Sequence, residues 1–100
     1  MTTQTSRSHS SDTATTACFS VHAAADPGIM PRVMGVFAKR GLVPSIWYSS
    51  LTGPQHEDLQ IDVQVRDMSF ADQSRIADAL RRIVGVEVVL TAEKRLAATA

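Results

Sequence analysis

The hydrophobic pattern changes its period at one turn, Asp26-Pro27-Gly28, and this change constrains the fold more than any other feature of the chain. Before the turn, apolar and polar residues alternate over 17–24, which predicts a strand with one buried face. After it, apolar residues recur at helical spacing over 29–40, which predicts an amphipathic helix. The folded part of the chain therefore begins with a strand, a tight turn and a helix.

The helix can start in two registers. If Asp26 is the N-cap, Pro27 suits the first helical position, but Pro31 lies too deep and its ring would clash with the carbonyl four residues back. If Gly28 is the N-cap, Pro31 falls within the first turn and is tolerated. We favour the second register.

This register leaves the backbone N–H groups of Gly28, Ile29 and Met30 at the positive end of the helix dipole. Such an end can receive a carboxylate or a phosphate. Asp26 would then brace the loop or face a ligand's amino group. The alternative is a plain strand-to-helix turn without a ligand.

Residues 42–66 predict a β-hairpin. Residues 42–51 are rich in β-formers, and Pro44 removes one ladder donor, which predicts an edge strand. Its buried face stays open, because Ile46 and Trp47 point opposite ways. A polar loop over 52–57 leads to residues 58–66, which alternate cleanly, with Leu59, Ile61, Val63 and Val65 facing inward.

A second helix and a last strand complete the pattern. Ser69 is the predicted N-cap, with Asp72 completing a weak capping arrangement. The predicted apolar stripe of this helix consists of Phe70, Ile76, Leu80 and Ile83, and Gly85 ends the helical region. In the last strand, Val86, Val88 and Leu90 alternate with Glu87, Val89 and Thr91.

The predicted order is strand, helix, strand, strand, helix, strand. Two right-handed crossovers place both helices on one face of an antiparallel sheet, in the α+β ferredoxin-like βαββαβ fold with strand order 4-1-3-2. The other face is open, and the second strand is an exposed edge that a homodimer can pair. Trp47 and Val89 are then expected at the open face or the interface.

Length and composition bound the remaining possibilities. The chain has 100 residues, enough for one domain, which we expect at 17–93 between a disordered tail (1–16) and a short C-terminal tail (94–100). Lys plus Arg and Asp plus Glu are balanced at 10 each, so a nucleic-acid binder is not expected. A single cysteine and no long apolar run predict a cytoplasmic protein without a membrane segment.

Other chemical candidates are weaker. Ser20 and His22 share one strand face, but we favour two polar residues on an open sheet face over a catalytic pair. The run His56-Glu57-Asp58 lacks distinctive metal-ligand spacing and fits a solvated hairpin tip. Arg81-Arg82 fits a solvated face or a partner contact.

The segments Asp26-Pro27-Gly28-Ile29-Met30 and 33–46 resemble the ACT domain family. The shared pattern is Asp-Pro-Gly after the first strand, a helix ending in a basic residue and glycine, and then a strand with Ile. The part Gly35-Val36-Phe37-Ala38-Lys39-Arg40-Gly41 is especially similar to the small regulatory subunit of acetolactate synthase, in its short form. The resemblance covers about residues 18–93.

The resemblance implies a non-catalytic regulatory subunit that forms homodimers through the edges of the second strand. It implies an effector site for an amino acid, with branched-chain amino acids expected, formed by Asp26, Gly28, Ile29 and Met30, and closed by Ser45 and Ile46 of the partner subunit. No cofactor is expected in this chain, whereas thiamine diphosphate and Mg are expected in the large catalytic subunit. Asp26 stands where the small subunits usually have Asn.

Two alternatives remain beside the regulatory subunit of acetolactate synthase. One is an amino-acid sensor that works without a fixed enzyme partner. The other is a small ferredoxin-like enzyme, for which Ser20 and His22 are the only candidate pair.

Overall fold

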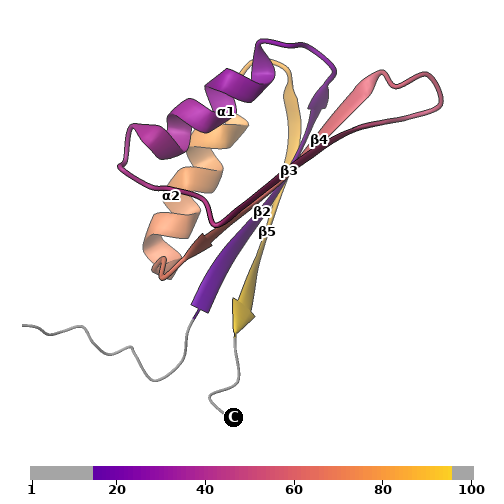
Figure 1. Ribbon diagram of the computed structural model, residues 1–100. Coiled ribbons are helices and arrows are strands. Elements are labelled where there is room, and N and C mark those ends of the chain that lie inside the picture. The colour runs from indigo at the N-terminus through magenta and orange to yellow at the C-terminus, as the bar shows by residue number, and fades with distance from the viewer. Residues whose placement is uncertain (1–14, 96–100) are drawn as a thin grey trace, which may run out of the picture.

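The structure, a computed structural model, describes residues 15–95 of the chain. Its elements, in order, are β2 (Thr15–Ala24), α1 (Ile29–Ala38), β3 (Ile46–Thr52), β4 (Asp58–Arg66), α2 (Phe70–Arg81) and β5 (Val86–Arg95). Both helices cover one face of the sheet, whose strand order is β3-β4-β2-β5 (Figure 1). The predicted ferredoxin-like fold and its 4-1-3-2 strand order are confirmed.

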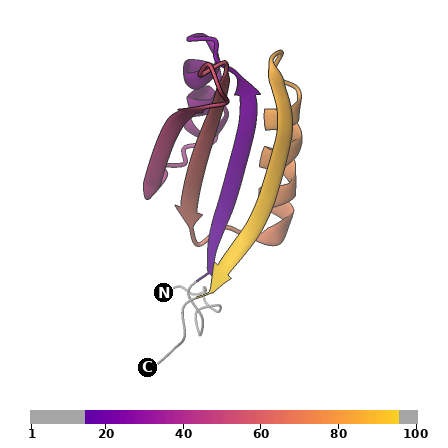
Figure 2. The same ribbon diagram turned by 90° about the vertical axis from the view of Figure 1, so that its right-hand side faces the viewer.

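The core lies between the sheet and the two helices, and Figure 2 looks onto the opposite, uncovered face of the sheet. The rings of Phe19 in β2 and Phe37 in α1 meet edge to face, with centroids 5.5 Å apart. The four inward residues predicted for β4 are all buried. This strand alternates as its sequence predicts, because β3 and β2 pair with it on both sides and leave no room for a shift in register.

The predicted start of α1 and the predicted left-handed Gly41 after it are confirmed, but the helix ends at Ala38, two residues before the predicted end. Gly28 is the N-cap, and the helix closes with hydrogen bonds from Gly41 N–H to Ala38 O and from Leu42 N–H to Phe37 O, both 3.0 Å. This pair of bonds is a Schellman motif, which places Gly41 in the left-handed region at φ 69°. The Arg40 guanidinium also donates to Val36 O at 2.8 Å, so this cation caps the helix.

The strand predicted to begin at residue 42 begins at Ile46 instead. Leu42 donates its N–H to the end of α1, and Pro44 has no N–H, so pairing with β4 starts only with Ser45 N–H, 2.8 Å from Gln64 O. The sequence did not decide which face of β3 is buried, and the structure shows that Trp47 packs against the core while Ile46 is exposed. The expectation that Trp47 lies on the open face was therefore wrong.

The alternation predicted for the last strand was also wrong, because Val89 is buried while Val88 and Leu90 are exposed. The pairing of β5 with β2 is irregular at one point: Ala23 pairs with Val86, but His22 pairs with Val88. One residue is thus inserted in β5, and this β-bulge inverts the faces of all later residues. The strand then continues as far as Arg95.

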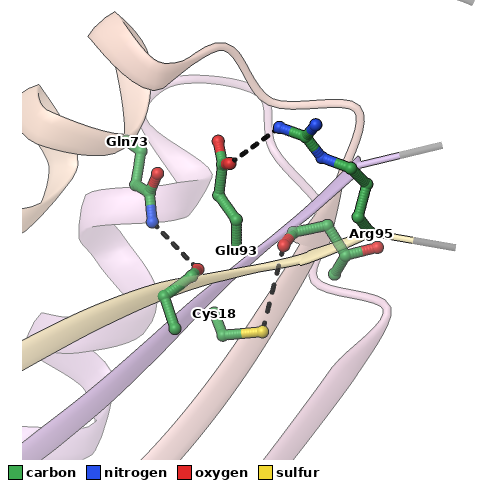
Figure 3. Close-up of polar contacts among 6 residues, drawn as sticks. Cys18, Gln73, Glu93 and Arg95 are labelled. Carbon is green, nitrogen blue, oxygen red and sulfur yellow. Dashed lines mark hydrogen bonds and ion pairs between the residues drawn. The ribbon is translucent and has the colours of Figure 1, made fainter. Parts of the chain in front are cut away.

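The buried stripe of α2 differs from the predicted one at its first turn. Phe70 is 72% exposed, whereas Met68, two residues earlier, fills that end of the core. Gln73 takes the inward position instead and donates from Nε2 to Ala92 O of β5 at 3.0 Å (Figure 3). The predicted N-cap is confirmed, since Ser69 Oγ accepts from Asp72 N–H at 3.1 Å. The Asp72 carboxylate, however, pairs with Arg75.

The predicted N-terminal tail lies outside the described residues, apart from Thr15 and Thr16, which begin β2. Residues 96–100 of the predicted C-terminal tail lie outside them as well. In the part of the chain that the structure describes, no helix is long and apolar enough to cross a membrane.

Candidate functional site

The corner between β2 and α1, where the sequence predicts a ligand, is anchored by two neighbouring loops. Ala24 donates its N–H to Gly85 O at 3.1 Å, and Ala25 donates its N–H to Glu57 O at 3.0 Å. The chain therefore leaves the sheet in a fixed direction. The corner is held by the loop before β5 on one side and by the β3–β4 hairpin on the other.

Asp26 organises the start of α1. Its Oδ1 accepts the N–H of Gly28 at 2.9 Å, and its backbone oxygen accepts the N–H of Ile29 at 3.0 Å. Of the three N–H groups predicted to bind an anion, those of Gly28 and Ile29 are thus already hydrogen-bonded to Asp26. Asp26 braces the loop, which was one of its two expected roles, and its exposed carboxylate presents negative charge beside the helix start.

A cation lies beside the same residue, Gly28. A Cβ built on Gly28 would stand 3.5 Å from Asp26 Oδ1 and 3.9 Å from the guanidinium of Arg32. The corner thus carries one carboxylate and one guanidinium next to the same backbone position. Arg32 was not among the predicted site residues, although its place four residues after Gly28, one helical turn away, is a signal that the sequence contains.

Ser45 and Ile46 lie at the other end of the sheet from Asp26. Ile46 pairs with Gln64, which pairs with Cys18 near the start of β2, whereas the corner follows Ala24 at its end. Six residues of extended strand separate the two ends, about 20 Å. One chain therefore brings together Asp26, Gly28, Ile29 and Met30, but not Ser45 or Ile46.

The pair Ser20 and His22 lies on the open face of the sheet, with Ser20 Oγ 3.1 Å from His22 Nε2. Asp62 is opposite Ser20 in the neighbouring strand, but its carboxylate accepts from the Gln60 amide at 3.2 Å. The carboxylate of Asp62 is thus hydrogen-bonded to Gln60, and among the described contacts none joins it to His22. Ser20 and His22 therefore lack the acidic residue that orients the histidine in a catalytic triad.

Within residues 15–95, no group of three His, Cys, Asp or Glu side chains could hold a metal ion. Glu57, in the candidate run at the hairpin tip, accepts from Gln55 N–H at 2.9 Å. Cys18 is half-buried, and its thiol points at Thr16 O, 3.9 Å away (Figure 3).

The other contacts of the basic residues were only partly foreseen. Arg81 pairs with Asp78 at 3.2 Å and also donates to Val89 O at 3.0 Å, so it ties α2 to β5. Its neighbour Arg82 instead lines a hollow between α1 and α2. The adjacent arginines therefore have different roles, which their sequence alone could not separate.

Comparisons with known structures support the fold. The ACT domain from GTP pyrophosphokinase of Chlorobium tepidum is 14% identical, with a TM-score of 0.66 over 77% of this chain and 96% of that one. The ligand-free regulatory subunit of aspartate kinase from Thermus thermophilus is 19% identical, with a TM-score of 0.61 over 87% of this chain and 64% of that one. The C-terminal domain of MgtC from Mycobacterium tuberculosis is 10% identical, with a TM-score of 0.65 over 80% and 87% of the two chains.

No curated protein matches the sequence. A family model does, and it is described as an ACT-like domain and matches residues 10–97. This match spans both strand–helix–strand units, the Asp26 corner and the whole of the four-stranded sheet. The chain therefore belongs to the ACT-like domain family.

Proposed function

We propose that this chain is a regulatory subunit that pairs through β3, binds an amino acid at the Asp26 corner and acts on an associated biosynthetic enzyme. ACT domains are generally non-catalytic regulatory modules that bind amino acids. The observation that carries the proposal is the unprotected edge of β3.

The two edges of the sheet differ in charge. β5 contains Glu87, Glu93, Lys94 and Arg95, and charged side chains discourage another strand from pairing. β3 contains no charged residue and exposes Ile46, Tyr48 and Leu51. An uncharged, partly apolar edge favours pairing with a second copy, which would give a continuous sheet and bury these side chains.

A two-fold axis through the middle of β3 gives the pairing a functional consequence. It would run the two β3 strands antiparallel and put the partner subunit's Ile46 opposite Thr52. Thr52 pairs with Asp58, which pairs with Ala24, so all of them lie at the end of the sheet that bears the Asp26 corner. The residues that one chain holds apart would thus meet at the same end of a dimer.

The charges at the corner suit an amino acid. A free amino acid carries an ammonium and a carboxylate, and Asp26 and Arg32 carry the opposite charges beside Gly28. The ammonium would face Asp26 and the carboxylate would face Arg32. This arrangement accommodates the Asp in place of Asn, because the carboxylate of the ligand need not approach Asp26.

For the enzyme partner, we propose the large subunit of acetolactate synthase, in branched-chain amino acid biosynthesis. The support is the similarity of residues 35–41 to the small regulatory subunit of that enzyme. One of the similar structures is the regulatory subunit of another enzyme, aspartate kinase, with the same fold.

The test measures acetolactate formation by the organism's large subunit, alone, with this chain, and with this chain plus valine. We expect the chain to raise the rate and valine to reduce the stimulated rate. Ser20→Ala/His22→Ala serves as a control and should stimulate as the wild type does, since the proposal gives this pair no role.

An absence of both stimulation and co-elution would reject acetolactate synthase as the partner. A thermal-shift screen of amino acids would then decide between another regulated enzyme and a sensor without an enzyme. A rate of turnover by this chain alone that depends on Ser20 and His22 would contradict the regulatory role.

A further inference from the structure

A groove between α1 and α2, on the side of the helices away from the sheet, gathers positive charge. It has a volume of about 800 Å³, and its walls carry Arg32 from α1, Lys39 and Arg40 just after α1, and Arg82 just after α2. No acidic side chain lines it. Four of the ten basic residues of a chain with no net charge therefore lie around one groove.

The cations of this helix groove are not used by acidic partners within the fold. Among the described residues, the ion pairs are Arg75–Asp72, Arg81–Asp78 and Arg95–Glu93, and none involves the four groove residues. The exposed positive charges repel one another, and an acidic partner would relieve this repulsion. The charge of the groove therefore favours a ligand that carries several negative charges.

The floor of the groove is aliphatic. Val36 and Ile83 are half-buried, Ala79 lies beside them, and Val84 is 84% exposed at one end. At Gly35 the surface of α1 carries no side chain, and nothing lies within 4 Å of the position that a Cβ would take there. The backbone of another segment can therefore approach α1 closely and lay apolar side chains on this floor.

The lining suits a protein segment better than a single-stranded nucleic acid. Proteins that bind single strands stack the bases on aromatic side chains, and the groove has none. Residues 32, 35 and 36 lie on one face of α1, and residues 39 and 40 follow just after its end. Opposite them are Ala79 of α2 and, just after α2, Arg82 and Ile83. Two adjacent helices (Figure 1) form the ridges between which a third helix packs.

We infer that the helix groove docks an acidic amphipathic helix of a partner protein, with its apolar stripe on the Val36–Ile83 floor and its Asp or Glu residues beside Lys39 and Arg82. The inference rests on the proposed function only for the identity of the partner, the regulated enzyme. The groove is on a different surface from the β3 edge, so a dimer could use both.

The first test uses a synthetic peptide of about 18 residues with leucines on one helical face and glutamates on either side. Its binding to the full chain is followed by fluorescence anisotropy. The variant Lys39→Glu/Arg82→Glu reverses two groove charges and spares Arg32, which the amino-acid site uses. The control Arg66→Glu/Arg75→Glu makes the same change of net charge outside the groove.

We expect the peptide to bind the wild type and the control alike, and the groove variant at least about tenfold more weakly. A peptide with the same residues in shuffled order should bind weakly to all three. The inference would be overturned if the peptide did not bind the wild type or bound both variants equally. It would also be overturned if a short single-stranded DNA bound more tightly than the peptide. Circular dichroism melting checks that both variants are folded.

The second test repeats the comparison with the large subunit of acetolactate synthase in a co-elution experiment. If the wild type and the control co-elute and the groove variant does not, the groove is the docking surface for the enzyme. If all three co-elute, the groove inference fails while the proposed function stands. If none co-elutes, the proposed partner is rejected, and the peptide result decides the inference.

Discussion

Asp26 Oδ1 accepts a hydrogen bond from the backbone N–H of Gly28 at 2.9 Å. This N–H is one of the groups predicted to bind an anion, so the Asp26 carboxylate itself takes the place of that anion. This contact separates two effects that mutation can test. One is the bracing of the loop, which any side-chain oxygen at this position can supply. The other is negative charge, which only Asp supplies.

Asp26→Asn should keep the fold, because the amide oxygen can accept the same N–H, and should weaken amino-acid binding by removing the charge that faces the ammonium. Asp26→Ala should in addition lower the free energy of unfolding by about 0.5–1 kcal/mol through loss of the hydrogen bond. Urea denaturation and calorimetric titration measure the two effects. Unchanged binding in both variants would move the ligand site away from this corner.

Gly28→Val offers a complementary test of the same site. Gly28 has φ −73° and ψ −13°, an ordinary helical conformation, and its Cβ would make ordinary contacts, so the substitution should leave the fold intact. The bulk should block close approach of a ligand to the corner. Binding that survives Gly28→Val in a folded variant would contradict the proposed site.

Gly85→Ala should destabilise the fold more than Gly41→Ala. Both glycines have positive φ, but a Cβ at Gly85 would stand 2.8 Å from Ile29 Cδ1, whereas Gly41 faces open space. We expect a loss of about 1 kcal/mol for Gly41→Ala and about 2–3 kcal/mol for Gly85→Ala. Equal losses in urea denaturation would contradict the contact between Gly85 and Ile29.

Gln73→Glu should make the stability depend on pH. Gln73 is 4% exposed and donates to a carbonyl, so only a protonated Glu could replace it. Burial would raise the folded-state pKa of this Glu above its unfolded value of about 4.3, so the variant is most stable in acid and loses stability as pH rises through the folded pKa. Denaturation curves across this range test the slope, with Gln73→Met as the uncharged control.

Val89→Asp should unfold the domain, whereas Leu90→Asp should be tolerated. The buried Val89 side chain belongs to the core, and a carboxylate there would have no partner, while Leu90 is 57% exposed. The melting temperatures of the two variants measure the difference. The opposite ranking would mean that β5 follows the simple alternation and has no bulge.

What the sequence predicts and what it misses have different physical origins. The start of α1 and the N-cap Ser69 follow from local backbone chemistry, and β4 follows from an uninterrupted alternation, so all of these were predicted correctly. The bulge in β5 depends on how this strand aligns with β2, which no local pattern contains. The misplaced face of Val89 follows from that alignment.

The helix α2 gives a second example. Phe70 was assigned to the core because it is apolar, but burial depends on where the helix crosses the sheet. The spacing of residues 73, 76, 77 and 80 would have identified the buried face if Gln73 had been allowed an inward role. For the candidate corner, the sequence predicted that Asp26 would either brace the loop or face a ligand, but not that it would bond to the N–H groups of Gly28 and Ile29.

The central claim is that β3 is the dimer edge, and sedimentation velocity tests it most directly. The wild type is compared with Tyr48→Lys/Leu51→Lys on β3 and with Val88→Lys/Leu90→Lys, which adds the same charges at exposed positions of β5. We predict a dimer for the wild type and the β5 variant, and a monomer for the β3 variant. A monomeric wild type, or a dimer that only the β5 variant disrupts, would contradict the claim.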